Sequence, residues 1–163
     1  MAGNAVTGSA VTGNAMTGNA MTGKAIVLAS WATLALFAVV AIPDALGVHA
    51  LNTPATITSV TLFLASLPMW VYAFGLVLVR STRGDDIAVG SWVFLTPSAP
   101  KEIRRHLLGA TALCIVLALA TGWANPFGIL VPMLQLGCAA LWGARHGAYP
   151  ARPAPAVAKG SRR

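Results

Sequence analysis

The acidic side chains, which could carry protons or bind cations, are few and lie outside the long apolar stretches of this chain. The 163 residues include four Asp and Glu. Asp44 follows the first apolar stretch, where we expect it to be solvated or to cap a helix, and Asp85 and Asp86 are expected to form a solvated turn. A proton-coupled transporter needs a carboxylate within the bilayer. The positions of these carboxylates therefore argue against that mechanism.

The three histidines and two cysteines do not form a pattern typical of a cofactor or metal site. His49, His106 and His146 all lie near the ends of apolar stretches, so no two are at matching depth, as a b-type haem would require. Cys114 and Cys138 are not in a CxxC arrangement, and small buried thiols are the ordinary interpretation. The sequence also lacks a nucleophile elbow, a phosphate loop and metal-ligand spacing. We therefore expect no enzyme, no catalytic or metal-binding residue and no cofactor.

Gln135 is the one strongly polar side chain deep within an apolar stretch. An amide in lipid needs a hydrogen-bonding partner, and polar side chains commonly join neighbouring helices in membranes. We interpret Gln135 as interhelical glue that bonds to a Thr, Ser or Tyr of another span. A contact to a substrate or ion is the alternative.

The distribution of basic residues predicts how these side chains are positioned. All eleven Lys and Arg lie on one side of a four-span topology: Lys24, Arg80, Arg83, Lys101, Arg104, Arg105, Arg145, Arg152, Lys159, Arg162 and Arg163. Positive charge in short loops stays in the cytoplasm. The sequence therefore predicts an all-α, polytopic integral protein of the inner (plasma) membrane, with four transmembrane helices and cytoplasmic N and C termini.

The composition also favours a membrane protein. Hydrophobic residues make up 56% of the chain and charged residues 9%, whereas soluble domains carry roughly 25% charged residues. The net charge of +7 could suggest nucleic-acid binding, but the basic residues flank apolar spans and are not interleaved with aromatic residues. We therefore expect the lipid bilayer as a partner, and no nucleic acid.

A transmembrane domain is predicted at 24–142, with spans at about 25–42, 57–79, 107–123 and 127–142. Pro43 and Asp44 are expected to end the first span. A signal peptide cleaved at Val48-His49-Ala50 is an alternative for this span, but its apolar run is longer than the roughly 7–15 residues usual in signals.

Both ends of the chain are predicted to be disordered. Residues 1–23 contain four pentapeptides (NAVTG, SAVTG, NAMTG, NAMTG), whose period fits neither a helix nor a strand. Met21 begins the last of the MTG units and is an alternative start of the protein. Residues 143–163 form a basic tail rich in Pro and Ala, which we expect to be extended or disordered.

The connection between the second and third spans contains an apolar segment and then a basic one. Residues 87–95 are too short to cross the bilayer and are expected to lie in its interface, anchored by Trp92. Ser98 is expected to cap the helix that leads into the third span. This helix carries our candidate contacts for anionic lipids: Lys101, Arg104 and Arg105.

Small and polar residues predict the faces on which the spans pack together. In the second span they are Thr58, Thr61, Ala65, Ser66, Met69, Tyr72 and Ala73, and the opposite, lipid-facing arc holds Phe63, Leu64, Leu67, Trp70, Val71, Phe74 and Leu78. In the third span they are Ala110, Cys114, Ala118, Thr121 and Gly122. The fourth span has a narrow helix-packing seam of Gly128, Pro132, Gln135, Ala139 and Gly143. Pro68 and Pro132 are expected to kink their helices.

Three motifs near the end of the chain are FGILVPM, LWGARHG followed by a proline, and RRHLLG at the start of the third span. Together, over residues 104–152, they resemble a family of small, functionally uncharacterised four-span membrane proteins of high-GC Gram-positive (actinobacterial) bacteria. The motifs look like helix ends and turns, and the family has no assigned activity, so the resemblance implies a fold but no functional residue. The shorter outer turn and the pentapeptide arm depart from that family.

These observations favour a non-enzymatic membrane protein, an accessory or scaffold subunit of a larger membrane assembly. Its partner would be another membrane protein or a second copy of the chain. A small oligomeric transporter or flippase-like carrier is the alternative. A carrier needs a water-accessible polar path, which Gln135, Tyr72, Thr58 and Thr61 would line.

Overall fold

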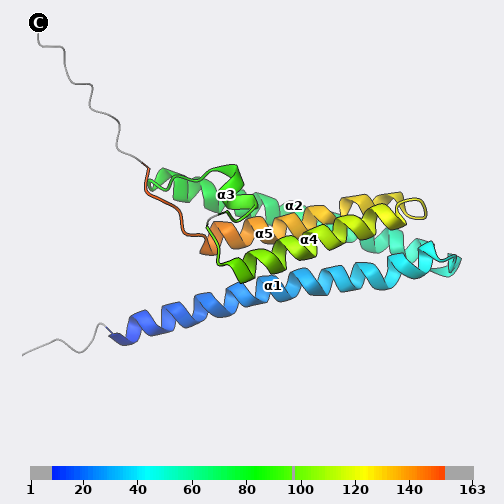
Figure 1. Ribbon diagram of the computed structural model, residues 1–163, viewed down its shortest axis with the longest axis horizontal. Helices are drawn as coiled ribbons and strands as arrows, with labels where there is room; N and C mark the ends of the chain where they lie inside the picture. Colours follow the sequence, from blue (N-terminus) through cyan, green and yellow to red (C-terminus); the bar gives the residue numbers. More distant parts are fainter. Residues whose placement is uncertain (1–8, 97, 153–163) are drawn as a thin grey trace, which may run out of the picture.

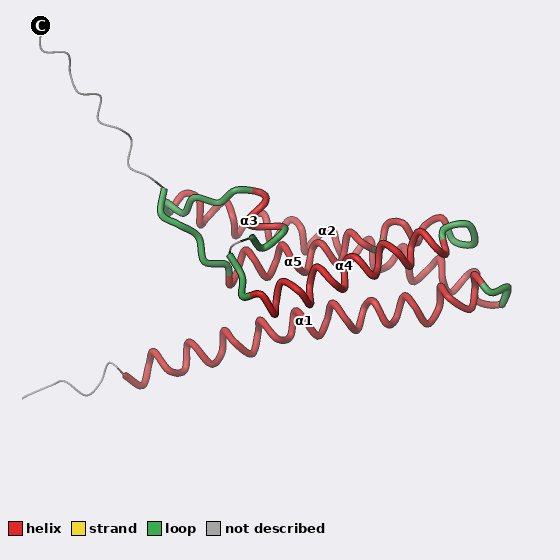
Figure 2. Tube along the Cα trace, viewed as in Figure 1, coloured by secondary structure: helices red, strands yellow, loops and turns green. Residues whose placement is uncertain are grey.

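Four long helices lie along one another in the computed structural model, and each runs antiparallel to the long helix before it (Figure 1). The structure describes the backbone of residues 9–96 and 98–152, and side chains from residue 23 onward within these ranges. Helices, turns and loops make up these described residues, without a strand (Figure 2). The elements are α1 (Ser9–Ala45), η1 (His49–Leu51), α2 (Asn52–Thr82), α3 (Val89–Val93), α4 (Lys101–Thr121), η2 (Pro126–Leu130) and α5 (Pro132–His146).

Four segments are long and apolar enough to cross a membrane, which confirms the expected all-α, four-span fold. They are Gly23–Ala45, His49–Thr82, Lys101–Thr121 and Pro126–His146. Two short 3₁₀ helices, η1 and η2, lie at one end of the bundle, which we call the far end (Figure 1). The start of α1, the end of α5 and the loop between α2 and α4 lie at the other end, which we call the basic end (Figure 1).

The first helix is longer than the span we predicted. α1 begins at Ser9, so the backbone of residues 9–23 is helical where we expected a disordered arm. Its 37 residues extend over ~55 Å at 1.5 Å per residue, and its N-terminal part projects past the other helices (Figure 1). The Gly, Thr and Asn residues of this segment are poor helix formers, but lengthening an existing helix avoids the cost of nucleation. The disorder predicted for residues 1–8 lies outside the described residues.

The last helix occupies the centre of the bundle, in place of presenting one narrow seam. α5 contacts α1, α2, α3 and α4. Its buried residues point in all directions around its axis: Leu134, Gln135, Gly137, Cys138, Ala139, Ala140, Trp142, Gly143 and Ala144. Gly128 of η2 is also buried, and Pro132 is half-buried. Most of these side chains are small, so neighbouring backbones can approach α5 on every side.

Two proline predictions and one capping prediction need correction. Pro132 does not kink the middle of a helix; it is a first-turn residue of α5, where its missing N–H costs nothing. α1 does not end before Pro43 but continues through it to Ala45. Ser98 does not cap α4, which has Pro100 at its N-cap, and donates instead to the carbonyl oxygen of Ser91.

Candidate functional site

The side chain of Gln135 joins α5 to α1 inside the bundle. It is fully buried. Its Oε1 accepts a hydrogen bond from Ser30 Oγ at 2.5 Å, and its Nε2 donates to the Ser30 carbonyl oxygen and to Thr33 Oγ1, both at 3.1 Å. The structure thus supplies the Ser and Thr partners expected on another span. The amide holds two helices together, and most of its hydrogen-bonding capacity is used in doing so.

Sequence reasoning did not identify Ser30 and Thr33 as the partners. Ser30 is completely buried, and Thr33 Oγ1 also donates to the Ala29 carbonyl oxygen at 2.9 Å. A signal was present, because these are two hydroxyls three residues apart in an otherwise apolar span. We assigned no packing face to that span.

A second set of buried polar groups lies at the far end. Asn125 is 1% exposed, and its Nδ2 donates to Ser59 Oγ of α2 at 3.0 Å while its Oδ1 accepts from the Phe127 amide. Asp44 is also buried, and its Oδ2 has no hydrogen-bond partner among the described residues. The expectation that Asp44 is solvated is therefore wrong. It lies three residues after the buried Ala41, on the side of α1 that faces the core.

Arg80 organises the basic end. Its Nε forms an ion pair with Asp85 Oδ2 at 2.8 Å, its Nη1 donates to the Ala144 carbonyl oxygen at 3.1 Å, and its guanidinium lies 4.8 Å from the centre of the Tyr149 ring. Asp85 is therefore paired, where we expected a solvated turn. A planar guanidinium can serve a carboxylate, a carbonyl and an aromatic face at once. One side chain thus ties together α2, α5 and the segments that follow each of them.

The first residues of the expected disordered tail are ordered. Residues 147–152 run beside the loop after α2: the Asp86 amide donates to the Pro150 carbonyl oxygen at 2.8 Å, and the Arg152 amide donates to the Gly84 carbonyl oxygen at 2.7 Å. Tyr149 Oη donates to the Gly143 carbonyl oxygen at 2.9 Å. Burial raises the pKa of Tyr149, which keeps this donor protonated. The rest of the tail, residues 153–163, lies outside the described residues.

Trp92 anchors α3 to the protein, and not to the membrane interface as we expected. It is 6% exposed, and its Nε1 donates to the Ala140 carbonyl oxygen of α5 at 2.8 Å. A Cβ added at Gly143 would collide with the Trp92 carbonyl oxygen. Leu95, three residues after Trp92, is fully buried although its φ of 58° lies in the left-handed region. Such a conformation is costly for a bulky residue, so burial of this side chain holds the loop in place.

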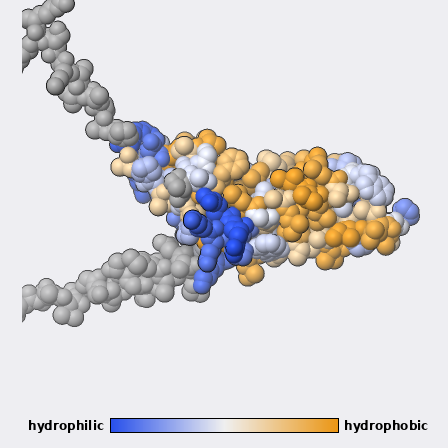
Figure 3. All heavy atoms as spheres, viewed as in Figure 1, coloured by the Kyte–Doolittle hydropathy of each residue, from blue (hydrophilic) through white to orange (hydrophobic). Residues whose placement is uncertain are grey.

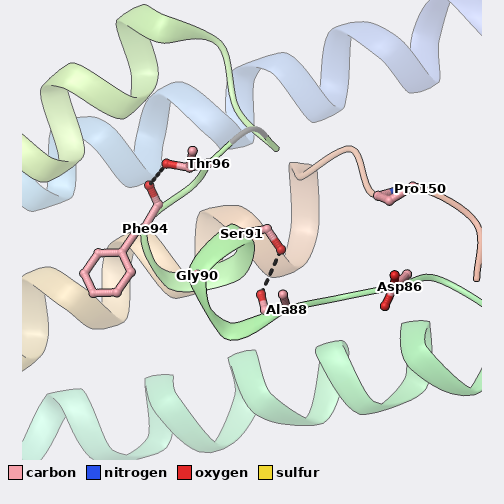
Figure 4. A pocket seen from close by; sticks show the side chains of 7 residues that line it. All are labelled: Asp86, Ala88, Gly90, Ser91, Phe94, Thr96 and Pro150. Carbon is pink, nitrogen blue, oxygen red and sulfur yellow. Dashed lines mark hydrogen bonds between the residues drawn. The ribbon is translucent and has the colours of Figure 1, made fainter.

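A hollow of about 630 Å³ opens between this loop and the tail. It is lined by Asp86, Ala88, Gly90, Ser91, Phe94, Thr96 and Pro150 (Figure 4). The hydroxyls at its edge close local turns, because Ser91 Oγ donates to the Ala88 carbonyl oxygen and Thr96 Oγ1 to that of Phe94 (Figure 4). Asp86 is its one charged lining residue. A mostly apolar lining with occupied hydroxyls does not present the nucleophile and base of a catalytic site.

Three basic side chains share one face of α4 at the basic end. Lys101, Arg104 and Arg105 line a hollow of about 530 Å³ together with Leu108 and Gly109. The strongest hydrophilic patch of the face drawn in Figure 3 lies at the basic end, whereas hydrophobic residues cover much of the rest. The three candidate contacts for anionic lipids thus lie together on α4, with Lys101 and Arg105 exposed and Arg104 half-buried.

Three of the four residues proposed to line a carrier path do not face one another. Gln135 points to α1, whereas Thr61 and Tyr72 of α2 are exposed on the outside of the bundle, Tyr72 by 52%. Conversely, Trp70, which we assigned to lipid, donates from Nε1 to the Met133 carbonyl oxygen at 3.0 Å. The packing face of α2 is therefore rotated from the predicted one. Its buried residues are Ala55, Ser59, Leu62, Ser66, Ala73 and Val77.

This rotation leaves α2 with a third face, which we call the outward stripe. It consists of Thr61, Ala65, Pro68, Tyr72 and Gly75, which are exposed and recur at spacings of four and three residues. At 100° per residue they fall within an arc of ~80°, between the core face and the bulky lipid face. The space around Gly75 is open. The outward stripe combines the small and polar residues typical of helix contacts in membranes with exposure in this chain.

No family model, curated protein or solved structure matches this chain.

Proposed function

We propose that this protein is a non-enzymatic accessory or scaffold subunit of a larger membrane assembly. In this proposal it lies in the plasma membrane with both ends in the cytoplasm, and a transmembrane helix of another membrane protein packs on the outward stripe. The observation that carries the proposal is the exposure of this stripe. Lipid-facing positions need only bulky apolar side chains, whereas small and polar ones allow close contact between helix backbones.

Tyr72 is the most informative residue of the stripe. Its hydroxyl has no hydrogen-bond partner among the described residues, and it lies eight residues, or ~12 Å along the helix axis, from Arg80 at the basic end. A phenol exposed at hydrocarbon depth is costly unless a partner accepts a hydrogen bond from its hydroxyl. A helix carrying a hydroxyl, an amide or a free carbonyl would satisfy it.

The occupied hydrogen bonds of Gln135 support the same function. The amide is bonded to Ser30 and Thr33, so binding a substrate would require breaking contacts that hold α1 on α5. The carrier hypothesis predicts the opposite use of this residue. The two functions are therefore separated by substitutions on the stripe and at Gln135.

The test is co-purification of membrane partners after gentle detergent extraction. Ala65→Leu and Gly75→Leu place bulk on the outward stripe, and each should reduce the recovered complex at least tenfold. Ala120→Leu makes the same kind of change on an exposed face of α4 and should leave recovery unchanged. If only copies of the chain itself co-purify, the partner is a second copy of this protein and the assembly is a homo-oligomer. Full recovery of the complex with both stripe variants would rule out the stripe as the docking face.

The Gln135→Leu variant tests the carrier alternative. Interhelical hydrogen bonds in membranes contribute about 0.6 kcal/mol on average and up to ~1.7 kcal/mol. The variant should therefore fold, assemble and support function, with a modest decrease in the temperature of thermal unfolding. Loss of a cellular phenotype despite intact folding and complex formation would favour the carrier over the scaffold.

A further inference from the structure

We propose that the basic hollow on α4 binds one anionic phospholipid, with its phosphate on Lys101, Arg104 and Arg105 and an acyl chain along Gly109 and Ala112. This site is independent of the proposed partner helix, because it lies on another helix. Its ligand would be a lipid of the bilayer, whereas the outward stripe would bind another membrane protein.

The charge of the hollow is available for a ligand. In the described part of the chain the ion pair within 4.0 Å is Arg80–Asp85, so Glu102 does not neutralise its three basic neighbours. Lys101 and Arg105 are exposed, and Arg104 is half-buried with Nη1 3.5 Å from Thr96 Oγ1. Three cations on the first two turns of one helix face complement a phosphate group. The planar fork of a guanidinium group can donate to two phosphate oxygens at once.

Beyond the hollow, small and apolar residues continue along the same exposed face of α4, in the direction of the membrane centre. Leu108 and Gly109 lie one to two turns after the cations. The space around Gly109 is open, and Ala112 and Val116 follow on the same exposed face. Cations in the hollow and the small residues Gly109 and Ala112 along the same helix face match an amphiphile, whereas a free anion would use only the cations.

The position along the bundle agrees with a lipid ligand. The cations are at the start of α4, at the basic end, so they are level with phosphates of the membrane surface if α4 crosses the bilayer. Positive charge at that end favours the cytoplasmic leaflet, whose anionic lipids attract basic segments next to a span. The hollow of about 530 Å³ is within the roughly 300–1,000 Å³ of small-molecule sites.

The test counts lipids bound to the purified full chain by native mass spectrometry. The protein in neutral detergent is titrated with phosphatidylglycerol and, separately, with phosphatidylcholine of the same acyl chains. The first phosphatidylglycerol should bind more tightly than the first phosphatidylcholine. Replacing Lys101, Arg104 and Arg105 together by Gln should weaken the binding of the first phosphatidylglycerol on the order of 100-fold, at about fivefold per cation. Equal affinity for the two lipids would overturn the proposal.

A matched control separates a site from diffuse attraction. Lys24→Gln, Arg83→Gln and Arg145→Gln together remove the same charge from exposed positions at the same end and should weaken binding by less than about fivefold. An equal loss in both triple variants would show attraction by net charge alone, and no site. If the triple variant does not fold, the single variant Lys101→Gln, at an exposed position at the start of α4, is measured in its place.

Filling the acyl path tests whether the ligand is a lipid or a soluble phosphate. The leucine side chain of the Gly109→Leu variant would point into open space. The variant should therefore keep its helix content but bind phosphatidylglycerol at least tenfold more weakly. Soluble glycerophosphoglycerol should compete poorly with the lipid for both the wild type and the Gly109→Leu variant. If it displaces phosphatidylglycerol at equal concentration, or if Gly109→Leu binds the lipid normally, the hollow is a site for phosphate groups and the acyl path is wrong.

Discussion

At the scale of single residues, the space around each glycine distinguishes structural positions from exposed ones. A Cβ at Gly143 would collide with the backbone carbonyl of Trp92, whereas Cβ atoms at Gly75 and Gly109 would meet no atom within 4 Å. The close approach at Gly143 brings α3 against α5 and allows Trp92 to donate to Ala140. We placed Gly143 in a seam that packs on other spans, but the atoms nearest to its Cβ position belong to Trp92 of the short helix α3 and to Leu95.

Gly143→Ala should destabilise the protein by about 1–3 kcal/mol, the usual cost of overpacking a closely packed position. The backbone of α3 must move, because no flexible side chain can yield in its place. The measurement is thermal unfolding in detergent, followed by circular dichroism. Gly75→Ala is the control and should not destabilise the protein, because its Cβ meets open space and Ala favours helix over Gly. Identical unfolding of wild type and Gly143→Ala would show that α3 does not pack closely on α5.

At the scale of elements, the segments after α2 and after α5 form one unit at the basic end. Arg80 contacts Asp85, Ala144 and Tyr149, and residues 84–86 exchange backbone hydrogen bonds with residues 150–152. Each contact is partly exposed, and exposed ion pairs contribute little to global stability. Their effect is to hold the two segments together locally.

Arg80→Lys should therefore release the tail while leaving the bundle intact. Lysine keeps the charge but lacks the fork that bonds Asp85 and Ala144 simultaneously. Hydrogen exchange should accelerate at the amides of Asp86 and Arg152 and remain slow in the spans. Arg83→Lys, at an exposed neighbouring position, is the control and should change neither. Unchanged exchange in Arg80→Lys would contradict the organising role of this side chain.

The N-terminal part of α1 is a second element-scale feature. A membrane needs about 20 apolar residues, and Gly23–Ala45 supplies them. A chain that begins at Met21 keeps this span and also keeps Gly23, whose Cβ position is 3.1 Å from Trp142 Nε1. It should insert, accumulate and unfold like the full chain. Poor accumulation of this shorter chain would show that residues 1–20 contribute to folding or insertion.

At the scale of the whole molecule, the basic residues of the spans and loops gather at one end of the bundle. Lys24, Arg80, Lys101 and Arg145 belong to four different helices, and antiparallel packing places them at the same end (Figure 1). The far end carries the two turns built on η1 and η2. We expect the basic end to be cytoplasmic because short basic loops are retained there.

Labelling of single cysteines tests this orientation in intact cells. With Cys114 and Cys138 replaced, Leu46→Cys and Trp123→Cys at the far end should react with an impermeant thiol reagent. Leu46 is 80% and Trp123 74% exposed. Gly90→Cys at the basic end should react only after the cells are permeabilised. Reaction of Gly90→Cys from outside would invert the topology.

The sequence by itself determined the number of spans, their approximate positions and the common location of the basic residues. These properties are local, because a run of apolar residues at 1.5 Å per residue either is or is not long enough to cross the bilayer. The packing face of α4 was also readable: Ala110, Cys114, Ala118 and Thr121 are buried as predicted. These four residues recur at spacings of three and four, which marks one face of a helix.

Only the tertiary structure decided which apolar face meets protein and which meets lipid. Lipid is as apolar as a helix interface, so hydropathy did not separate the buried Leu62 from the exposed Leu64, or reveal that Thr61 and Tyr72 lie outside the bundle. The central place of α5 and the pairing of residues 84–86 with 150–152 likewise depend on neighbours distant in sequence. Close packing and hydrogen bonds between distant segments, and not the local pattern of residues, fixed these contacts.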